Sequence, residues 1–215
     1  MPYKLNNIGY SVMKTGINLV QIEQLRATLF SEGKAGARCL LDDAKVCEVS
    51  RQLKDQLSKS GFLSPSAIAI QAIAFDKTAN TNWQVTWHQD LMFPFASHPQ
   101  AADYTLSCEK DGVVYARPPL LVLEQLTAVR LHLDDCDEGN GPLKISPGSH
   151  QYGIVKSEEV VSLVQTHGEV TCLAREGEVI LMKVLALHAS SKAIHPVHRR
   201  VLHIVYHSGE AITEK

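Results

Sequence analysis

The chain has 215 residues, a length that fits one domain with a sizeable buried core. Its formal net charge of −2 and the lack of a basic tract argue against general nucleic-acid binding. No apolar run reaches the roughly 18 residues needed to cross a membrane, and residues 1–16 contain no apolar signal core. The five cysteines include no Cys-x-x-Cys pair, which is typical of reduced thiols. We therefore expect a cytoplasmic protein with neither a nucleic-acid nor a membrane partner.

Residues 18–61 are predicted to form a helical flank of two amphipathic helices. The first covers residues 18–33, with Asn18 as its N-cap and Gly33 at its end, and the second covers residues 43–61, capped by Asp42 or Asp43. Their apolar stripes consist of Leu19, Ile22, Leu25 and Leu29 in the first helix, and Val46, Val49, Leu53 and Leu57 in the second. Such stripes must cover an apolar surface, most simply a sheet.

From residue 64 onward the sequence consists of short apolar runs of β type, separated by turn signals. The predicted strands cover residues 66–75, 83–88, 120–133, 142–146, 169–173, 178–184 and 200–207. No helix is expected among them. Many strands at short spacing indicate an antiparallel sandwich or small barrel, so the fold class is mainly β with flanking N-terminal helices.

The segment from residue 91 to 119 has no steady period and contains four prolines. A loop of this length within a compact domain is usually functional. Because it directly follows the sequence Trp87-His88-Gln89-Asp90, it can form a lid or specificity loop over a site there. An ordered surface excursion is the alternative.

His88 and Asp90 are the first candidate metal ligands. The preceding residues, 83–87, are rich in aromatic and β-branched types, which favours a strand. On a strand, residues two apart share a face and lie about 6.6 Å apart, so both side chains can lean onto one ion. One imidazole and one carboxylate, joined by a second imidazole from elsewhere, form the facial triad of non-haem Fe(II) oxygenases.

His188 is the strongest candidate for the second imidazole. It ends the apolar run of residues 179–187, so its ring should be buried and in need of a partner. A core histidine with an ordinary hydrogen-bond partner is the simpler reading of His188 alone. Ser190 and Arg199 downstream favour the metal site, since a hydroxyl and a guanidinium suit the far carboxylate of a chelating ligand. Arg200 competes with Arg199 for that role, because adjacent strand residues face opposite ways.

The other histidines are weaker candidates. His203 and His207 lie about 13 Å apart along one strand and cannot chelate one ion together, so we expect ordinary strand histidines. His132 shares a strand face with the cation Arg130, which works against a nearby metal. The remaining ones lie in predicted loops or turns: His98, His150, His167, His195 and His198.

Four stretches together make the chain resemble the phytanoyl-CoA dioxygenase family of Fe(II)/2-oxoglutarate oxygenases. They are residues 82–90 (Asn-Trp-Gln-Val-Thr-Trp-His-Gln-Asp), 130–135 (Arg-Leu-His-Leu-Asp-Asp), 140–150 (Asn-Gly-Pro-Leu-Lys-Ile-Ser-Pro-Gly-Ser-His) and 177–199. The resemblance runs from about residue 5 to residue 207. In its overall sequence the chain most resembles small bacterial members of the family.

The resemblance implies a double-stranded β-helix, or jelly roll, over residues 64–210 within one domain covering residues 1–215. It implies that His88, Asp90 and His188 bind Fe(II), that Arg199 pairs with the far carboxylate of 2-oxoglutarate, and that Ser190 assists it. Related halogenases lack the acidic ligand, so the presence of Asp90 favours O₂-dependent hydroxylation of a small organic molecule, with release of succinate and CO₂.

Two other functions stay open: a non-catalytic metal- or ligand-binding jelly roll, and a cupin-like enzyme that does not use 2-oxoglutarate. In the second case, Arg199 would not be needed for activity. For the substrate pocket, the expected apolar wall consists of Trp87, Leu91, Met92 and Phe93, which can equally be plain core. Arg117, Arg130 and Lys144 are candidates for binding an anionic substrate, or are simply structural charges.

Overall fold

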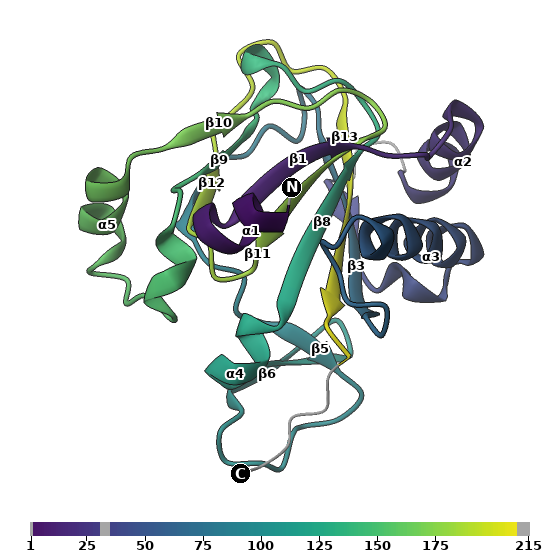
Figure 1. Cartoon of the computed structure of the whole chain (residues 1–215). Helices are drawn as coiled ribbons and strands as arrows, with labels where there is room; N and C mark the ends of the chain where they lie inside the picture. Colours follow the sequence, from purple (N-terminus) through teal and green to yellow (C-terminus); the bar gives the residue numbers. More distant parts are fainter. Residues whose placement is uncertain (1, 31–34, 210–215) are drawn as a thin grey trace.

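A computed structural model describes residues 2–30 and 35–209 and shows two antiparallel sheets that face each other, as in a jelly roll (Figure 1). The major sheet has the order β1-β11-β8-β13-β3-β2, and the minor sheet has the order β10-β9-β12-β4. The major strands are β1 (Tyr10–Lys14), β11 (Glu178–Lys183), β8 (Leu126–His132), β13 (Arg199–His207), β3 (Ile68–Lys77) and β2 (Gly36–Ala37). The minor strands are β10 (Val170–Cys172), β9 (Leu143–Ile145), β12 (His188–Ser190) and β4 (Val85–His88). This architecture confirms the expected fold class.

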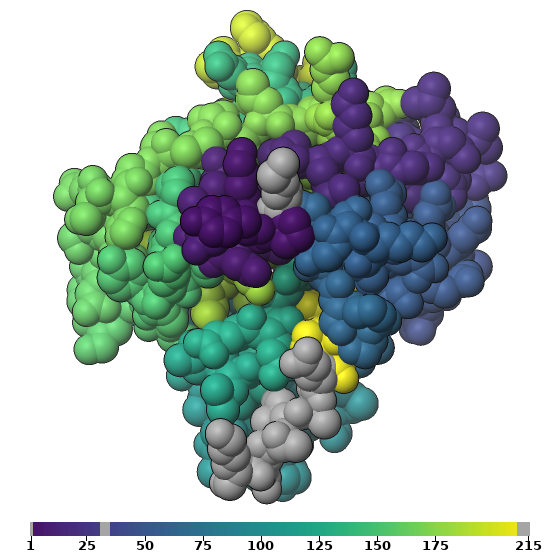
Figure 2. Space-filling model, viewed as in Figure 1, coloured from purple at the N-terminus to yellow at the C-terminus, as the bar shows by residue number. Residues whose placement is uncertain are grey.

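Two helices cover the outer face of the major sheet: α2 (Leu19–Leu29) and α3 (Ala44–Lys59) (Figure 1). The other helices are α1 (Pro2–Ile8), α4 (Leu120–Glu124) and α5 (Val160–His167), with short 3-10 turns η1 (Leu40–Asp42), η2 (Glu138–Asn140) and η3 (Ser149–Tyr152). In the space-filling view the N-terminal residues (dark purple) lie beside those of α3 (blue) on one face of the molecule (Figure 2). Among the described residues, no helix is long and apolar enough to span a membrane.

The helical flank forms for the expected reasons, except that Leu19 is exposed and the buried stripe of α2 consists of Ile22, Leu25 and Leu29. Asn18 caps α2 because its side chain accepts a hydrogen bond from the Gln21 backbone N–H, and the Gln21 side chain in turn accepts one from the Asn18 backbone N–H. Asp43, rather than Asp42, caps α3. The first helix ends at Leu29, earlier than expected, and Gly33 lies outside the described residues.

The major sheet separates two apolar cores, because successive strand residues point to opposite faces. Val129 and Leu131 of β8 pack under the helices, whereas Ala128 packs between the two sheets. On β13, Leu202 and Ile204 likewise face the helices. The alternate positions of both strands therefore face the interior between the sheets, where a site can be built.

The prediction of one long strand over residues 120–133 is wrong. Residues 120–124 form helix α4, whose N-cap is Pro119, and strand β8 begins only at Leu126. An apolar run without alternation fits either element, and the φ of −62° at Pro119 suits the start of a helix. Helix α5 also contradicts the expectation that no helix follows residue 64.

Residues 91–119 are not an irregular loop, because they contain a third sheet of β5 (Phe93–Phe95), β7 (Val113–Arg117) and β6 (Thr105–Lys110). Strands β6 and β7 are joined by Asp111 and Gly112, which both have positive φ values of 52° and 75°. Asp-Gly with two positive φ angles is the tight hairpin turn that matches strand twist. A bulge in the pairing of β6, between Thr105 and Cys108, hides the regular alternation that would have predicted this hairpin.

Candidate metal centre and cosubstrate pocket

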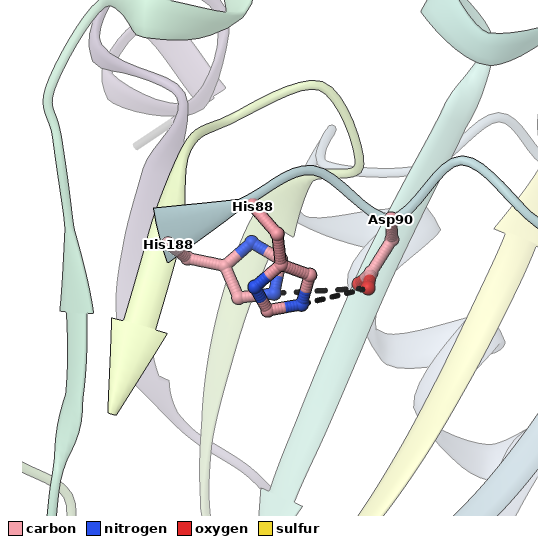
Figure 3. Close-up of side chains that lie close together, drawn as sticks. All are labelled: His88, Asp90 and His188. Atoms are coloured by element: carbon pink, nitrogen blue, oxygen red, sulfur yellow. Dashed lines mark ion pairs between the residues drawn. The ribbon is translucent and has the colours of Figure 1, made fainter. Parts of the chain in front are cut away.

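His88, Asp90 and His188 converge at one end of the minor sheet, although 98 residues separate the last two (Figure 3). His88 ends β4 and His188 begins β12, and these two residues are direct partners in the antiparallel pair. The backbone of Asp90 donates to Val184 O at 3.0 Å, which fixes the turn that brings its carboxylate back to the histidines. Nε2 of each histidine lies 3.7 Å from Asp90 Oδ1.

The hydrogen bonds of the two imidazoles leave one nitrogen of each ring free for a metal. Nδ1 of His88 bonds to Thr86 O at 2.9 Å, and Nδ1 of His188 bonds to Ala186 O at 3.0 Å. A carbonyl oxygen only accepts, so Nδ1 carries the proton in both rings and Nε2 has a free lone pair. The three ligand atoms lie within 4.8 Å of one another. Two donors bound to one ion at about 2.1 Å lie roughly 3 to 4 Å apart, so these residues fit a single metal ion.

The protonation states suit the same task. Burial acts to raise the pKa of Asp90, but the imidazoles of His188 and His88 lower it by more, so the net pKa is well below its usual range. The carboxyl is therefore an anion at neutral pH. Burial lowers the pKa of His188 to about 4, despite the nearby Asp90 carboxylate. A neutral imidazole and an ionised carboxylate are the forms that bind metal. Two histidines and one carboxylate on one side of an ion, with open positions beyond, are diagnostic of non-haem Fe(II) sites.

A cavity of about 300 Å³ lies next to these three residues, between the minor and major sheets. The residues that line it are Arg38, Gln71, Ile73, Phe75, Trp83, Val85, His88, Asp90, Met92, Cys108, Lys110, Tyr115, Arg130, Leu143, His188, Ala189, Ser190, Arg199 and His203. Of the four residues expected to form its apolar wall, only Met92 does so. Phe93, on β5, is buried in the core between the sheets instead, and Leu91 packs against that core.

Arg199 and Arg200, the two candidates for the cosubstrate cation, have different environments. Arg199 is 3% exposed and lines the cavity, and its Nε and Nη1 have no hydrogen-bond partner among the described residues. Arg200 faces away and forms two hydrogen bonds with Asp134, at 2.9 and 2.7 Å. A buried guanidinium with unpaired donors needs an anion, so Arg199 fits the far carboxylate of a ligand held at the metal.

Ser190 lies on the same side of the cavity and accepts a hydrogen bond from Lys77 Nζ at 3.0 Å. Lys77 is fully buried and lies directly opposite Arg199 in the pairing of β3 with β13. Burial and the nearby charges of Arg199 and Arg130 lower the pKa of Lys77 to about 7. Sequence reasoning missed Lys77, because it lies two residues beyond the predicted strand of residues 66–75 and ends β3 in the structure.

Arg130 and His203 are two further cavity residues on the major sheet. Arg130 was one of three candidates for anion binding, whereas the other two lie elsewhere: Arg117 bonds to Thr105, and Lys144 pairs with Glu169. The expectation that His203 is an ordinary strand histidine is wrong, since its Nε2 lies 3.8 Å from Asp90 Oδ2. The cavity position of His203 could have been predicted from the alternation of β13, because His203 is four residues from Arg199 and so shares its face of the strand.

The fold and this site define a jelly-roll protein with a two-histidine, one-carboxylate centre. The family model "Phytanoyl-CoA dioxygenase (PhyH)" matches residues 20–201, and the chain therefore belongs to this family. Membership makes it an Fe(II)- and 2-oxoglutarate-dependent dioxygenase. No protein with a curated description matches the sequence.

Three solved structures illustrate the likeness in fold. EctD from S. alaskensis, with 2-oxoglutarate and 5-hydroxyectoine, has a TM-score of 0.68 and 18% identity, covering 96% of this chain and 74% of EctD. AviO1 from Streptomyces viridochromogenes Tue57 has a TM-score of 0.65 and 16% identity, covering 100% and 96%. HygX from Streptomyces hygroscopicus, with nickel and 2-oxoglutarate, has a TM-score of 0.63 and 14% identity, covering 95% and 85%. At these identities the likeness establishes the fold.

Proposed function

We propose that His88, Asp90 and His188 are the protein ligands of the catalytic Fe(II). The observation that carries this proposal is the convergence of one carboxylate oxygen and two Nε2 atoms, each nitrogen 3.7 Å from that oxygen. Bound iron supplies O₂ activation at the positions that these three residues leave open. The chain's own residues hold the metal on one side and keep its other side facing the cavity.

The proposed cosubstrate site is the Arg199 end of the cavity. Arg199 offers two unpaired N–H groups and can hold the far carboxylate of 2-oxoglutarate with two parallel hydrogen bonds. Ser190, on β12 two residues after His188, supports this with its hydroxyl. The two neighbours EctD and HygX were solved with 2-oxoglutarate bound, which agrees with this assignment for the shared fold.

The proposed reaction is hydroxylation of a small organic substrate. One C–H bond of the substrate becomes C–OH, and 2-oxoglutarate becomes succinate and CO₂; one atom of O₂ enters the new hydroxyl group and the other enters succinate. The residues of the 91–119 segment that line the cavity are Met92, Cys108, Lys110 and Tyr115, and we assign this third sheet the role of lid and specificity element. We further propose that residues 1–215 act as a single domain and that the enzyme works in the cytoplasm.

Anaerobic titration with Fe(II) and 2-oxoglutarate tests the ligand assignment. Wild-type protein should develop a weak visible charge-transfer band, which His188→Ala and Asp90→Ala should abolish. His207→Ala is the matched control, because its ring contacts the Gly209 backbone and lies outside the cavity. A wild-type protein that shows no band and no affinity for 2-oxoglutarate would contradict the proposal.

The second test is oxygen consumption coupled to succinate formation. It separates the dioxygenase from a non-catalytic jelly roll. A metal enzyme that does not use 2-oxoglutarate would keep its activity in Arg199→Met, whereas the proposed enzyme should lose it.

A further inference from the structure

Arg130 is a cation at the centre of the major sheet with no anionic partner. It lies on β8 facing the interior and is 8% exposed. Its Nη1 bonds to His203 Nδ1 at 3.1 Å, while its Nε has no hydrogen-bond partner. No carboxylate of the described residues forms an ion pair with it, and burial and the charge of Arg199 lower its pKa despite the opposing charge of Asp90. The guanidinium thus keeps a free N–H and an uncompensated charge.

His203 does not neutralise this charge. A guanidinium only donates, so His203 Nδ1 accepts and the proton of that ring is on Nε2. A histidine ring is either neutral or positively charged, so it cannot offset the charge of a guanidinium. His203 therefore orients Arg130 between the sheets and leaves its positive charge to be matched by something else.

The charges of the cavity point to a second bound anion. Asp90 is the only carboxylate among the residues that line it, whereas Arg38, Lys110, Arg130 and Arg199 are cations. In the proposed complex, Fe(II), Asp90 and 2-oxoglutarate together carry one negative charge, which Arg199 balances. Arg130 then remains buried and unpaired, an arrangement that is costly in a protein interior. A ligand other than 2-oxoglutarate is the natural source of the missing negative charge.

The position of Arg130 separates it from the proposed cosubstrate site. Arg130 is the direct partner of His203 in the pairing of β8 with β13, and His203 lies four residues from Arg199. Four residues of a strand span about 13 Å, so the two side chains leave the backbone at different rows of the sheet, although the charge of Arg199 still lowers the pKa of Arg130. The wall near Arg130 is apolar and includes Ile73 and Phe75.

We propose that Arg130 binds a carboxylate of the substrate and that the substrate is therefore a small carboxylic acid with an apolar body. Ile73, Phe75 and Leu143 contact the body, while Arg38 and Lys110 on the cavity wall favour entry of an anion. The inference rests on the proposed function, since it assumes that Arg199 holds 2-oxoglutarate. Arg130 is then a specificity-determining residue rather than a ligand of the cosubstrate.

Two matched pairs of probes test this inference: hexanoate against hexanamide, and phenylacetate against phenylacetamide. Each probe is added at millimolar concentrations to the anaerobic protein, already saturated with Fe(II) and 2-oxoglutarate so that Arg199 is occupied. Quenching of tryptophan fluorescence reports binding, because Trp83 lines the cavity. At least one carboxylate should bind about tenfold or more tightly than its amide, because hydrogen bonds to a charged partner are the stronger kind.

The variants Arg130→Met and Arg130→Lys identify the residue responsible. Arg130→Met should bring the carboxylate-to-amide ratio close to one and leave 2-oxoglutarate affinity within about threefold of wild type, whereas Arg130→Lys should keep part of the preference. Arg117→Met is the matched control, since Arg117 bonds to Thr105 outside the cavity. It should behave as wild type.

Several results would overturn the inference. They are a preference that survives in Arg130→Met, a wild-type protein that binds no carboxylate better than its amide, and an Arg130→Met variant that weakens 2-oxoglutarate as strongly as Arg199→Met. The last result would assign Arg130 to the cosubstrate. The wild-type comparison needs no variant, so it decides the matter even if Arg130→Met does not fold. A missing charge-transfer band would instead refute the proposed function, and the fluorescence comparison can still be made with 2-oxoglutarate and no iron.

Discussion

Replacing Arg199 and Arg200 separately should affect two different properties of the enzyme. These neighbours on β13 face opposite ways: Arg199 lines the cavity with unpaired N–H groups, and Arg200 is bound to Asp134. Arg199→Met should therefore weaken 2-oxoglutarate binding and leave the free energy of unfolding unchanged or higher. Arg200→Met should lower the free energy of unfolding and leave 2-oxoglutarate affinity unchanged.

The expected magnitudes follow from these contacts. Hydrogen bonds to charged groups contribute about 1.5 to 3 kcal/mol each, so losing a bidentate grip of about 3 kcal/mol raises the dissociation constant of 2-oxoglutarate roughly 100-fold. Removal of Arg199 also takes away a buried charge that lacks a protein partner, which is why stability does not fall. For Arg200, two hydrogen bonds are lost between side chains that are 21% and 14% exposed. Asp134 keeps Arg26 at 3.0 Å, so the loss is about 1 to 2 kcal/mol.

Two assays measure these effects. The anaerobic charge-transfer titration gives 2-oxoglutarate affinity, and thermal unfolding of the metal-free protein gives stability. For a chain of this length, about 1 to 2 kcal/mol corresponds to a Tm roughly 3 to 6 °C lower. The reasoning is refuted if Arg200→Met weakens 2-oxoglutarate as much as Arg199→Met does, or if Arg199→Met lowers Tm more than Arg200→Met.

Two further predictions concern stability. Leu53→Ala should lower the free energy of unfolding in urea by about 2 to 5 kcal/mol, because Leu53 is fully buried between α3 and the major sheet. Leu19 is 67% exposed, so Leu19→Ala should lower it by less than about 0.5 kcal/mol. Equal losses would contradict the packing described. Burial and the charge of Arg130 lower the pKa of His132 to about 3. Below about pH 6.5 the unfolded chain therefore binds a proton at His132 that the folded chain does not bind. The free energy of unfolding consequently falls as the pH decreases. His132→Leu should therefore lose about 2 kcal/mol less than wild type between pH 7 and pH 5, and identical pH slopes would show that His132 does not contribute.

Features that depend on near neighbours could be predicted from the sequence. The caps Asn18 and Asp43 and the apolar stripes of α2 and α3 are local patterns. The strand that ends at His88 likewise follows from a local pattern, but the prediction that Asp90 shares that strand is wrong, because β4 ends at His88 and Asp90 lies in the following turn. The Asp111-Gly112 turn was an equally local signal that went unused, and so the third sheet was mistaken for a loop.

The composition of the cavity depended on tertiary structure. A strand residue faces the site or the helices according to its register, and a slip of one residue exchanges the two faces. The pairing of β13 with β3 and β8 is what turns Arg199 and His203 inward and Arg200 outward, and it places Lys77 and Arg130 opposite them. The sequence by itself determined the three metal-binding candidates and the class of fold, because each rests on short patterns and their order. Only long-range strand pairing decided which buried cations share the cavity with them, because that depends on contacts between segments far apart in the chain.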